Sequence, residues 1–326
     1  MSSSPTDSSS APNVLCLGEI LVDFIADTPG SLATVPSFRK CPGGAPANVA
    51  VGVARLGVSC GFIGKVGDDQ FGRFLTETLR SNGVNTQSVL PTSEAPTAIA
   101  FVALSPDKKP DFFFYRDPCA DLLLAPKDLP RDWLKQTKIL HVGSVSLTRE
   151  PSREATRQAA ELATKSGARV TFDPNLRIDL WKGGIKECRQ EVLRILPFTD
   201  FFLPSIEELL LLMETRDSQE AINNLLELGP RVICIKMGSD GILVVDASSS
   251  GAPEMFEQAA FPVDVIDTTG AGDAFNAGLI TGVVEGLPLK EAVKQGNAVA
   301  ALAIAKKGAM TGLPTRPQLE EFLDAF

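Results

Sequence analysis

The stretch DTTGAGD at 267–273 holds the residues best suited to chemistry. It joins two hydroxyl side chains, a Gly-Ala-Gly turn and the carboxylate of Asp273, which opens a predicted helix over 273–285. Glycines let the backbone approach an anion closely. The first amides of a helix and its dipole then stabilise negative charge. Asp273 would stand where it can take a proton from an attacking hydroxyl, which is typical of phosphoryl transfer. The alternative is that Asp273 is an ordinary helix N-cap.

A second glycine-rich stretch, CPGGAPANVA at 41–50, also leads into a predicted helix. Its adjacent glycines admit a small ligand close to the backbone. Asn48, one turn into that helix, offers both a hydrogen-bond donor and an acceptor, which suits sugar hydroxyls. The alternative is a plain turn and helix start, and this stretch alone does not decide between the two.

Neither common nucleotide-binding fingerprint is present. The stretch GKVGDDQFG at 64–72 reads as a loop before a helix, but Ser59 stands where a P-loop needs glycine and Val66 where it needs Ser or Thr. A dinucleotide motif fails because Phe275 takes the place of its third glycine, which argues against a nicotinamide-dependent dehydrogenase. A Ser-His-Asp hydrolase would have to use His141, the only histidine. His141 lies in an apolar, strand-like run, so a packed or hydrogen-bonded histidine is favoured there.

The composition is that of an ordinary globular chain of 326 residues, 44% of them hydrophobic. The net charge of −9 argues against nucleic acid or an anionic membrane as the main partner, and no apolar run reaches the length of a membrane span. Six cysteines without a C-x-x-C pair predict free thiols rather than zinc or disulfides. The Ser/Pro-rich residues 1–12 predict a disordered tail without the arginines of a transit peptide. A cytoplasmic location is therefore expected, although this tail leaves a plastid open.

The elements that must position these residues follow an α/β pattern. Short apolar runs at 14–20 and 59–63 predict strands, and 44–56 and 71–81 predict helices. From 138 onward, strands at 138–142, 168–172, 200–203 and 231–236 alternate with helices at 151–166, 183–196, 205–213 and 217–228. The end is helical, at 274–285, 288–306 and 315–325. This alternation predicts a mostly parallel sheet covered by helices on both faces.

The early part of the chain differs from the rest. The segments 21–40 and 96–122 are β-prone and predict a small separate sheet, in which 97–104 and 111–115 form a hairpin across a polar turn at 106–110. Ligands of open α/β sheets bind beyond the carboxyl ends of the strands. A small sheet placed there would act as a lid that excludes water.

Taken together, the two glycine-rich stretches and the 65–72 segment resemble the PfkB/ribokinase family of sugar kinases over residues 13–314. Smaller matches follow in the same order: GEILVD at 18–23, FYRDPCAD at 114–121, DPNLR at 173–177, KMGSDG at 236–241 and KGA at 307–309. Within the family, the first two of these and GGAPAN at 43–48 are most similar to fructokinase. The resemblance implies a ribokinase-like three-layer α/β/α sandwich, with one kinase domain over 13–326.

The resemblance also implies roles for individual residues. Asp273 would be the catalytic base, and Gly270, Ala271 and Gly272 would form the amide hole for the transferring phosphoryl group. Sugar hydroxyls or the phosphorylated product would be held by Asp23, Gly43, Gly44, Asn48, Arg116 and Arg177. ATP would lie beside Lys236, Gly238, Gly241 and Asn297.

Two cations follow from the same resemblance. Magnesium would accompany ATP, and Glu208 would act on it through water. Relatives often place Asn where this chain has Ser205, whose side chain has a shorter reach. A potassium ion would lie behind the amide hole, near Asp267, Thr269, Ala303 and Gly308. Some relatives supply serine where this chain has Gly312, so the potassium site is left open.

The expected activity is ATP-dependent phosphorylation of the primary hydroxyl of fructose, giving fructose 6-phosphate, in a chain that is also compatible with a homodimer. The main alternative is a 2-keto-3-deoxygluconate kinase. Such kinases tend to have two tyrosines before the arginine that matches Arg116, and this chain has Phe114 and Tyr115. Ribokinase and adenosine kinase fit the motifs less well. A non-catalytic relative would be expected to lack the base or the glycines, which are present here.

Overall fold

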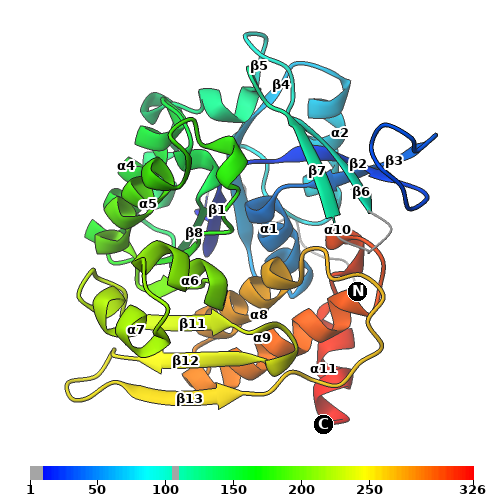
Figure 1. Cartoon of the computed structure of the whole chain (residues 1–326). Coiled ribbons are helices and arrows are strands. Elements are labelled where there is room, and N and C mark those ends of the chain that lie inside the picture. Colours follow the sequence, from blue (N-terminus) through cyan, green and yellow to red (C-terminus); the bar gives the residue numbers. More distant parts are fainter. Residues whose placement is uncertain (1–9, 105–109) are drawn as a thin grey trace.

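A large, mostly parallel sheet forms the centre of the computed structural model, which describes residues 10–104 and 110–326 (Figure 1). Within these residues the sheet has nine strands in the order β13-β12-β11-β10-β9-β8-β1-β4-β5, with β12 and β13 antiparallel to their neighbours. The strands are β1 (Val14–Leu17), β4 (Cys60–Gly67), β5 (Val89–Thr92), β8 (Ile139–Gly143), β9 (Arg169–Asp173), β10 (Phe201–Phe202), β11 (Val232–Lys236), β12 (Ile242–Asp246) and β13 (Glu254–Gln258).

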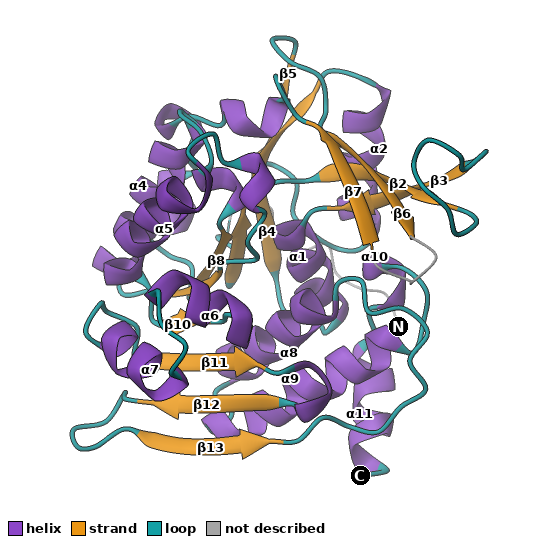
Figure 2. Cartoon of the chain, viewed as in Figure 1, coloured by secondary structure: helices purple, strands orange, loops and turns teal. Residues whose placement is uncertain are grey.

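Helices cover both faces of this sheet, which confirms the predicted three-layer arrangement (Figure 2). In β1, Leu15 and Leu17 pack against one helical layer and Val14 and Cys16 against the other, because successive side chains alternate between the faces. The first layer holds α3 (Arg131–Leu134), α4 (Ser152–Lys165), α5 (Gly184–Ile195), α6 (Ile206–Met213) and α7 (Ser218–Leu226). The second holds α1 (Ala45–Arg55), α2 (Gln70–Ser81), α8 (Ala271–Glu285), α9 (Leu289–Ile304), α10 (Ala309–Gly312) and α11 (Arg316–Asp324).

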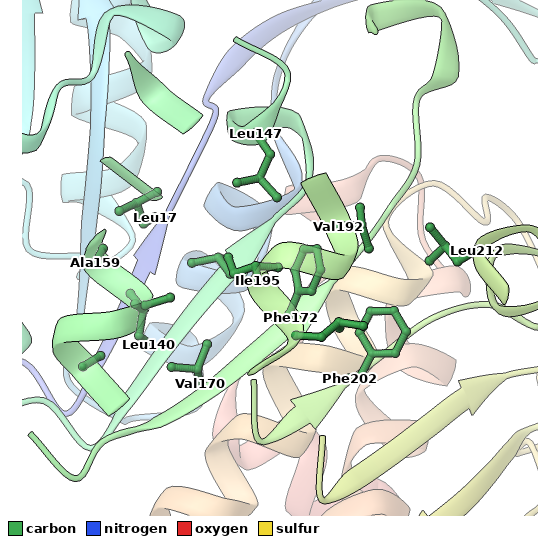
Figure 3. Packing of buried hydrophobic residues seen from close by; sticks show 14 of the residues in the cluster. Leu17, Leu140, Leu147, Ala159, Val170, Phe172, Val192, Ile195, Phe202 and Leu212 are labelled. Carbon is green, nitrogen blue, oxygen red and sulfur yellow. The ribbon is translucent and has the colours of Figure 1, made fainter. Parts of the chain in front are cut away.

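The core beneath the first layer is filled by aliphatic and aromatic side chains from every central strand (Figure 3). Phe172 of β9 and Phe202 of β10 are both fully buried, with ring centroids 5.6 Å apart. None of the described helices has the length and apolarity needed to span a membrane.

A second sheet of four strands, among the described residues, stands apart at the upper right of Figures 1 and 2. Its order is β3-β2-β6-β7, with β2 (Leu21–Ala26), β3 (Phe38–Gly43), β6 (Ile99–Leu104) and β7 (Pro110–Tyr115). These strands come from the segments that predicted a small sheet, and β6 and β7 form the expected antiparallel hairpin. Most of the polar turn predicted at 106–110, and residues 1–9 of the predicted tail, lie outside the described residues. That this sheet acts as a lid stays a prediction.

The structure corrects three boundaries. Strand β4 runs on to Gly67, so Lys65 lies in a strand rather than a loop, where its ammonium pairs with Asp128 at 2.8 Å. Helix α8 begins at Ala271, because Gly270 adopts a left-handed conformation (φ 78) that starts the helix without a side-chain cap. Asp273 therefore lies within the first turn and is not an N-cap. Two antiparallel strands, β12 and β13, extend the sheet where the sequence pattern gave no strand bounds.

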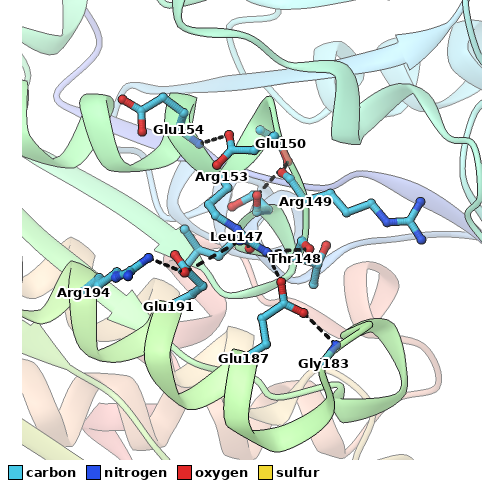
Figure 4. A network of polar contacts seen from close by, with 12 residues as sticks. Leu147, Thr148, Arg149, Glu150, Arg153, Glu154, Gly183, Glu187, Glu191 and Arg194 are labelled. Atoms are coloured by element: carbon cyan, nitrogen blue, oxygen red, sulfur yellow. Dashed lines mark hydrogen bonds and ion pairs between the residues drawn. The ribbon is translucent and has the colours of Figure 1, made fainter.

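The turn after β8 is fixed by a network of polar contacts (Figure 4). Arg153 of α4 donates to the carbonyls of Leu147 and Thr148 at 2.7 and 2.9 Å, and pairs with Glu187 of α5 at 2.6 Å. Glu187 also accepts the amide of Gly183 at 2.8 Å. The network thus ties the segment at the carboxyl end of β8 to the two helices on that face.

Helices α8 and α9 pack backbone to backbone. A Cβ on Gly278 would lie 2.8 Å from the Cα of Gly296 and 2.9 Å from the carbonyl oxygen of Gln295. No side chain fits at either glycine without movement, so the contact depends on their small size.

We expect Gly278→Ala to lower the free energy of unfolding by about 1–3 kcal/mol, because the added methyl must push the helices apart. Alanine is the better helix former by about 1 kcal/mol, which works against this effect. Asn224→Ala, on the exposed face of α7, is the matched control and should leave stability unchanged or slightly higher. Urea unfolding of both variants measures the difference. A Gly278→Ala protein as stable as the control would show that the helices separate without cost.

Candidate active site

Two cavities lie on either side of the first turn of α8. The smaller, of about 110 Å³, is lined by Glu19, Leu21, Asp23, Gly44, Ala45, Asn48, Phe114, Arg116, Val145, Asn175, Arg177, Leu180, Thr269, Gly270, Asp273 and Ala309. The larger, of about 610 Å³ and mainly apolar, is lined by Lys236, Gly238, Ser239, Gly241, Ile242, Ala260, Phe261, Pro262, Val263, Val265, Thr268, Ala271, Gly272, Phe275, Asn297, Ala300, Ala301 and Ile304. The turn 268–273 contributes to both, so it forms the wall between them.

Asp273 lies at this wall and is held by the other glycine-rich helix. It is only 7% exposed, and Asn48 Nδ2 donates to its Oδ2 at 2.7 Å. Both helices start at a glycine, Gly44 for α1 and Gly270 for α8. At Gly44 (φ 106) a Cβ would lie 2.5 Å from the carbonyl oxygen of Glu19, so no other residue fits there. The structure thus brings together the two stretches that the sequence singled out.

The surroundings of Asp273 favour proton transfer near neutral pH. Burial raises the pKa of Asp273 to about 7, and the charges of Asp173 and Glu19 act in the same direction. The hydrogen bond from Asn48 and the charge of Lys236 oppose them. A carboxyl group whose pKa lies near the working pH is well matched to take up a proton and to release it again.

Backbone amides at the start of α8 face this junction. The amide of Ala271 donates to the carbonyl of Thr268 at 3.1 Å, which closes the turn. Within the described chain, the amides of the next two residues, Gly272 and Asp273, have no acceptor. These two amides, with the positive end of the helix dipole, make a place for an anion.

Asp23 reaches the small cavity from β2, across Gly43. A Cβ on Gly43 would lie 2.0 Å from Asp23 Oδ2, so this glycine leaves room for the carboxylate although it does not itself line the cavity. Burial raises the pKa of Asp23 to about 7, against the positive charge of Arg177. Arg177 Nη1 donates to Asn175 Oδ1 at 2.8 Å, which orients the guanidinium at the cavity wall.

Arg116 is brought to the same cavity from the end of β7. It is 6% exposed and forms an ion pair with Asp121. The two residues before it point in different directions, because side chains alternate along a strand. Phe114 lines the cavity, whereas Tyr115 is 61% exposed and lines a separate groove on the small sheet.

A charged cluster stands at the junction of the cavities. Asp173, at the carboxyl end of β9, accepts from Lys236 Nζ and from Asn276 Nδ2, both at 2.6 Å. Glu208 accepts the amide of Leu176 at 2.6 Å. Burial and the charge of Asp173 raise the pKa of Glu208, whereas Lys236 lowers it. The predicted magnesium residue therefore belongs to a network of two carboxylates and one ammonium.

The residues predicted for potassium also lie close together. Asp267 accepts the amides of Thr269 at 2.9 Å and of Gly308 at 2.8 Å. Burial alone would raise the pKa of Asp267, but hydrogen bonds from the hydroxyl and amide of Thr269 and the amide of Gly308, with the charge of Lys307, hold the pKa below the ordinary value. The carbonyl oxygen of Ala303 lies against Gly312, where a Cβ would approach it to 2.6 Å.

The residues predicted for the nucleotide all line the large cavity. Gly238 and Gly241 lie in the turn between β11 and β12, next to Lys236. Asn297 of α9 is 6% exposed and donates to the carbonyls of Gln258 and Ala259 at 3.1 and 3.0 Å. Its amide nitrogen therefore anchors the segment after β13, which forms the opposite wall.

Sequence reasoning assigned no role to three residues at the site: Asp173, Asn276 and Glu19. Asp173 is the last residue of β9, and Glu19 lies two residues after β1. Both are thus at carboxyl ends of strands of the parallel sheet, which is a usable signal for site residues. Asn276 is an isolated polar residue in an apolar helix and is fully buried. No described group of three or more His, Cys, Asp or Glu is arranged to hold a metal ion by itself.

The expected packed histidine is confirmed. His141 is 1% exposed, and its Nδ1 lies 2.9 Å from Thr171 Oγ1. Burial lowers its pKa to about 4, so it is neutral at physiological pH. All six cysteines are free thiols, also as expected.

Comparisons with known proteins agree with this geometry. Residues 11–316 match the family described as pfkB family carbohydrate kinase. The protein named "Probable fructokinase-6, chloroplastic" from Arabidopsis thaliana is 40% identical, over 98% of this chain and 85% of that protein. A fructokinase with bound ATP from Xylella fastidiosa is 32% identical with a TM-score of 0.87, over 96% of this chain and 98% of that one.

A double-mutant fructokinase from Vibrio cholerae O395, solved with fructose, ADP and potassium ion, is 34% identical with a TM-score of 0.84. It is matched over 99% of its length and 96% of this chain. The fold and the paired cavities define a small-molecule kinase with the ribokinase-like architecture. The chain belongs to the pfkB family of carbohydrate kinases.

We expect Asp273→Asn to raise the melting temperature by a few degrees at pH 8 and by less at pH 5. The pKa of Asp273 is about 7 in the folded protein and about 4 in an unfolded chain. Between those values the folded state holds the extra proton, so stability falls as the pH rises from 4 to 7. Asparagine can still accept from Asn48 without that loss.

Thermal melts at both pH values measure this effect. Asp132→Asn is the control, because the side chain of Asp132 is 87% exposed. An Asp273→Asn protein with the same gain at both pH values would contradict a raised pKa.

Proposed function

We propose that the chain is an ATP-dependent fructokinase, which transfers the terminal phosphoryl group of ATP to the primary hydroxyl of fructose and gives fructose 6-phosphate. The observation that carries the proposal is the wall at 268–273, which separates a small cavity lined by charged and amide side chains from a larger, mainly apolar one. Sugar in the first and nucleotide in the second would meet at Asp273. The fructokinases among the similar proteins, one with ATP and one with fructose, support this choice.

In the proposed reaction, Asp273 takes the proton of the sugar hydroxyl as the hydroxyl oxygen attacks the terminal phosphorus of ATP. The bond from that phosphorus to the bridging oxygen breaks, and ADP leaves. The amides of Gly272 and Asp273 hold the equatorial oxygens of the transferring group, and Gly270 and Ala271 shape the turn that presents them. Catalysis of this kind depends on positioning and electrostatics, because the transition state spreads negative charge over oxygens. The N-terminus of α8 supplies both.

The small cavity would bind the sugar through groups that recognise hydroxyls. Asp23 and Asn48 accept hydrogen bonds, and Arg116 and Arg177 donate them. Asn48 Nδ2 is engaged by Asp273, whereas its buried Oδ1 has no partner among the described residues and is left for a hydroxyl donor. Gly44 brings the backbone itself close to the ligand.

The large cavity would hold ATP, with the adenine on its apolar wall and the phosphates directed to α8. Lys236 lies beside the path of the phosphates, and Gly238, Gly241 and Asn297 border the nucleoside. Oxygen ligands suit magnesium, and Glu208 and Asp173 offer carboxylates at this place. Both are engaged by protein donors, which fits contact through water. When bound, magnesium would neutralise phosphate charge.

Ser205 stands where relatives often carry asparagine, and it caps α6 instead. Its hydroxyl accepts the amide of Glu208 at 3.2 Å, and the carboxylate of Glu208 accepts the amide of Ser205 at 2.8 Å. This capping box fixes Glu208 at the start of the helix. Ser205 would therefore act on the metal only through Glu208.

Potassium would bind near Asp267, with oxygens of Thr269, Ala303 and Gly308 nearby. The ionised carboxylate of Asp267 and neighbouring backbone carbonyls suit a monovalent cation. The ion would brace the turn that carries the amides rather than touch the reacting atoms. The potassium in the Vibrio cholerae structure supports this part of the proposal.

The small sheet would close over the sugar as a lid. Asp23 of this sheet and Arg116, which directly follows β7, reach into the cavity, so closing the sheet would complete the site and exclude water. The location of the protein is also a prediction, and a cytoplasmic one is expected. A plastid is the alternative, because the name of the Arabidopsis thaliana relative includes the word chloroplastic.

One observation disfavours a 2-keto-3-deoxygluconate kinase. The carboxylate of that substrate calls for extra donors, and a tyrosine hydroxyl before Arg116 would be one. Here Phe114 lines the cavity, whereas Tyr115 is 61% exposed and lines a separate groove on the small sheet. The cavity thus gains no tyrosine hydroxyl from either residue.

A homodimer through the small sheet is a further part of the proposal. Leu32, Ala33, Phe38, Phe101, Phe113 and Tyr115 line a groove of about 390 Å³ on this sheet. Phe113 is 52% exposed, and contiguous exposed apolar surface of this kind is typical of interaction sites. A second copy of the same sheet would cover it by two-fold symmetry.

We expect the wild type to sediment as a dimer, and the double variant Phe113→Ser, Tyr115→Ser to sediment as a monomer. Sedimentation velocity at several protein concentrations measures this. Met255→Ser is the control, because Met255 is 44% exposed but lies on β13, outside the small sheet. A monomeric wild type would contradict the dimer without affecting the proposed activity.

We expect kcat/KM for fructose to exceed that for ribose, glucose, adenosine and 2-keto-3-deoxygluconate by about tenfold or more. Asp273→Asn should lower kcat by about 10²–10⁴-fold, because the base is lost while the volume is kept. An assay of ADP release with magnesium, with and without potassium, measures both. Asp132→Asn serves as the control and should keep normal kcat.

Two outcomes would count against the proposal. Preference for another sugar would leave the kinase fold intact and overturn the fructose assignment. Normal kcat in Asp273→Asn would remove Asp273 as the base.

A further inference from the structure

Glu19, which none of the assigned motifs places in the site, lies in the loop from β1 to β2 and lines the small cavity. Its side chain is buried, with 5% of the residue exposed. One carboxylate oxygen, Oε1, accepts the amide of Ala45 at 3.1 Å, at the start of α1. The other, Oε2, is buried and has no hydrogen-bond partner among the described residues.

We propose that Glu19 is a further sugar-binding residue, whose Oε2 accepts a hydrogen bond from a hydroxyl of the substrate. This inference rests on the proposed sugar kinase function and deepens it. It assigns to Glu19 a part in sugar selectivity that lies outside the proton transfer at Asp273.

The first reason is the cost of leaving a buried carboxylate oxygen unmatched. A buried acceptor without a donor forfeits its hydration, and the loss is larger when it is charged. The nearby cation, Arg116, does not remove this cost, because no donor of its guanidinium reaches Oε2, and the guanidinium is paired with Asp121 instead. A hydroxyl donated from a bound ligand would supply the missing partner.

The second reason is that Glu19 is not the only unmatched acceptor in the cavity. Asn48 Oδ1 is also buried without a partner in the described part of the chain. Two acceptors around one small space call for a ligand that donates at two points. A polyhydroxyl sugar can do this. A deoxy sugar that lacks one of the two hydroxyls would leave one acceptor buried without a hydrogen bond and would bind more weakly.

The third reason is electrostatic. Burial raises the pKa of Glu19 to about 7, and Arg116 opposes this. The charge of Glu19 in turn raises the pKa of Asp273. The charged groups that interact with Glu19 are thus Arg116, Asp121 and Asp273. Arg116 and Asp273 line the small cavity, and Asp121 is the ion-pair partner of Arg116.

The test is Glu19→Gln, which keeps an oxygen for the amide of Ala45 and replaces the free oxygen by an amide nitrogen. We expect the KM for fructose to rise about tenfold or more, and the KM for ATP to stay within about twofold. Because a negative charge near Asp273 is removed, its pKa falls. The acid limb of the pH profile of kcat/KM should therefore move to lower pH.

Glu77→Gln is the matched control, because Glu77 is 63% exposed in its side chain and forms its ion pair with Arg80 on the surface of α2. It should change neither KM nor the pH profile. If Glu19→Gln does not fold, Glu19→Asp keeps the charge and withdraws the oxygen by one methylene. The same rise in the KM for fructose is then expected.

Fructose analogues that each lack one hydroxyl identify the group that is bound. With the wild type, kcat/KM for one of these analogues should be about tenfold lower than kcat/KM for fructose. With Glu19→Gln, the same ratio should be less than twofold. A lowered melting temperature with an unchanged KM for fructose in both Glu19 variants would overturn the inference and leave Glu19 a structural role. A wild type that prefers another sugar contradicts the fructose assignment instead, and the same ratios then test Glu19 with that sugar.

Discussion

The site depends on one buried hydrogen bond, from Asn48 to Asp273, between residues 225 positions apart in the chain. It forms because α1 and α8 pack side by side on the same face of the large sheet, with their first turns together. The two cavities open where these helix ends converge. The bond also links Asp273, the proposed base, to the small sheet, since β3 ends at Gly43 and α1 begins two residues later. A movement of the small sheet would therefore act on the position of Asp273 through one short segment.

The convergence of these helix ends places several carboxyl groups in a buried site, where the ionised form of each is disfavoured. Glu19, Asp23 and Asp273 line one small cavity, and the pKa of each is raised to about 7. Above that pH the empty site works against folding, because like charges are held together away from water. Two packed cores, one on each face of the sheet, provide the stability that tolerates this. A ligand rich in hydroxyl donors would hydrogen-bond to these buried carboxylates and lower this cost. Binding of a sugar would therefore raise the free energy of unfolding.

Much of the fold could be predicted from the sequence, because its strands and helices have strong and different periodicities. The alternation after residue 138 matches β8 to β11 and α4 to α7 within a few residues. One helix start differs by more: α8 begins at Ala271 and not at Asp273, because a left-handed glycine can begin a helix without a side-chain cap. The extension of β4 to Gly67 depends on pairing with β5 and is invisible in local sequence.

The sequence predicted those residues of the candidate site that belong to a local motif. It did not predict those that become neighbours only when distant segments fold together. The glycine-rich stretches pointed to Asn48 and Asp273, and the structure brings the two side chains into contact. No role was predicted for Asp173, Asn276 and Glu19, because each is a single polar residue whose neighbours come from distant segments. The partners of Asp173, for example, are Lys236 and Asn276, from β11 and α8. Only the parallel sheet, which collects strand ends at one edge, makes such residues neighbours.

The two cavities differ in size and lining, and this difference indicates which of them would select the sugar and which would bind the nucleotide. A small cavity with buried, unmatched acceptors selects strongly, because a ligand that lacks one hydroxyl leaves an acceptor without a partner. A larger apolar cavity binds by contact area and selects less, so its shape matters more than any single group. Phe261 on its wall packs against Phe322 and Phe326, with ring centroids 5.2 and 5.1 Å away, so α11 and the residues after it brace that shape. Selectivity for the sugar would thus reside in a few polar atoms around Asp273, and nucleotide binding in packing that extends to the last helix.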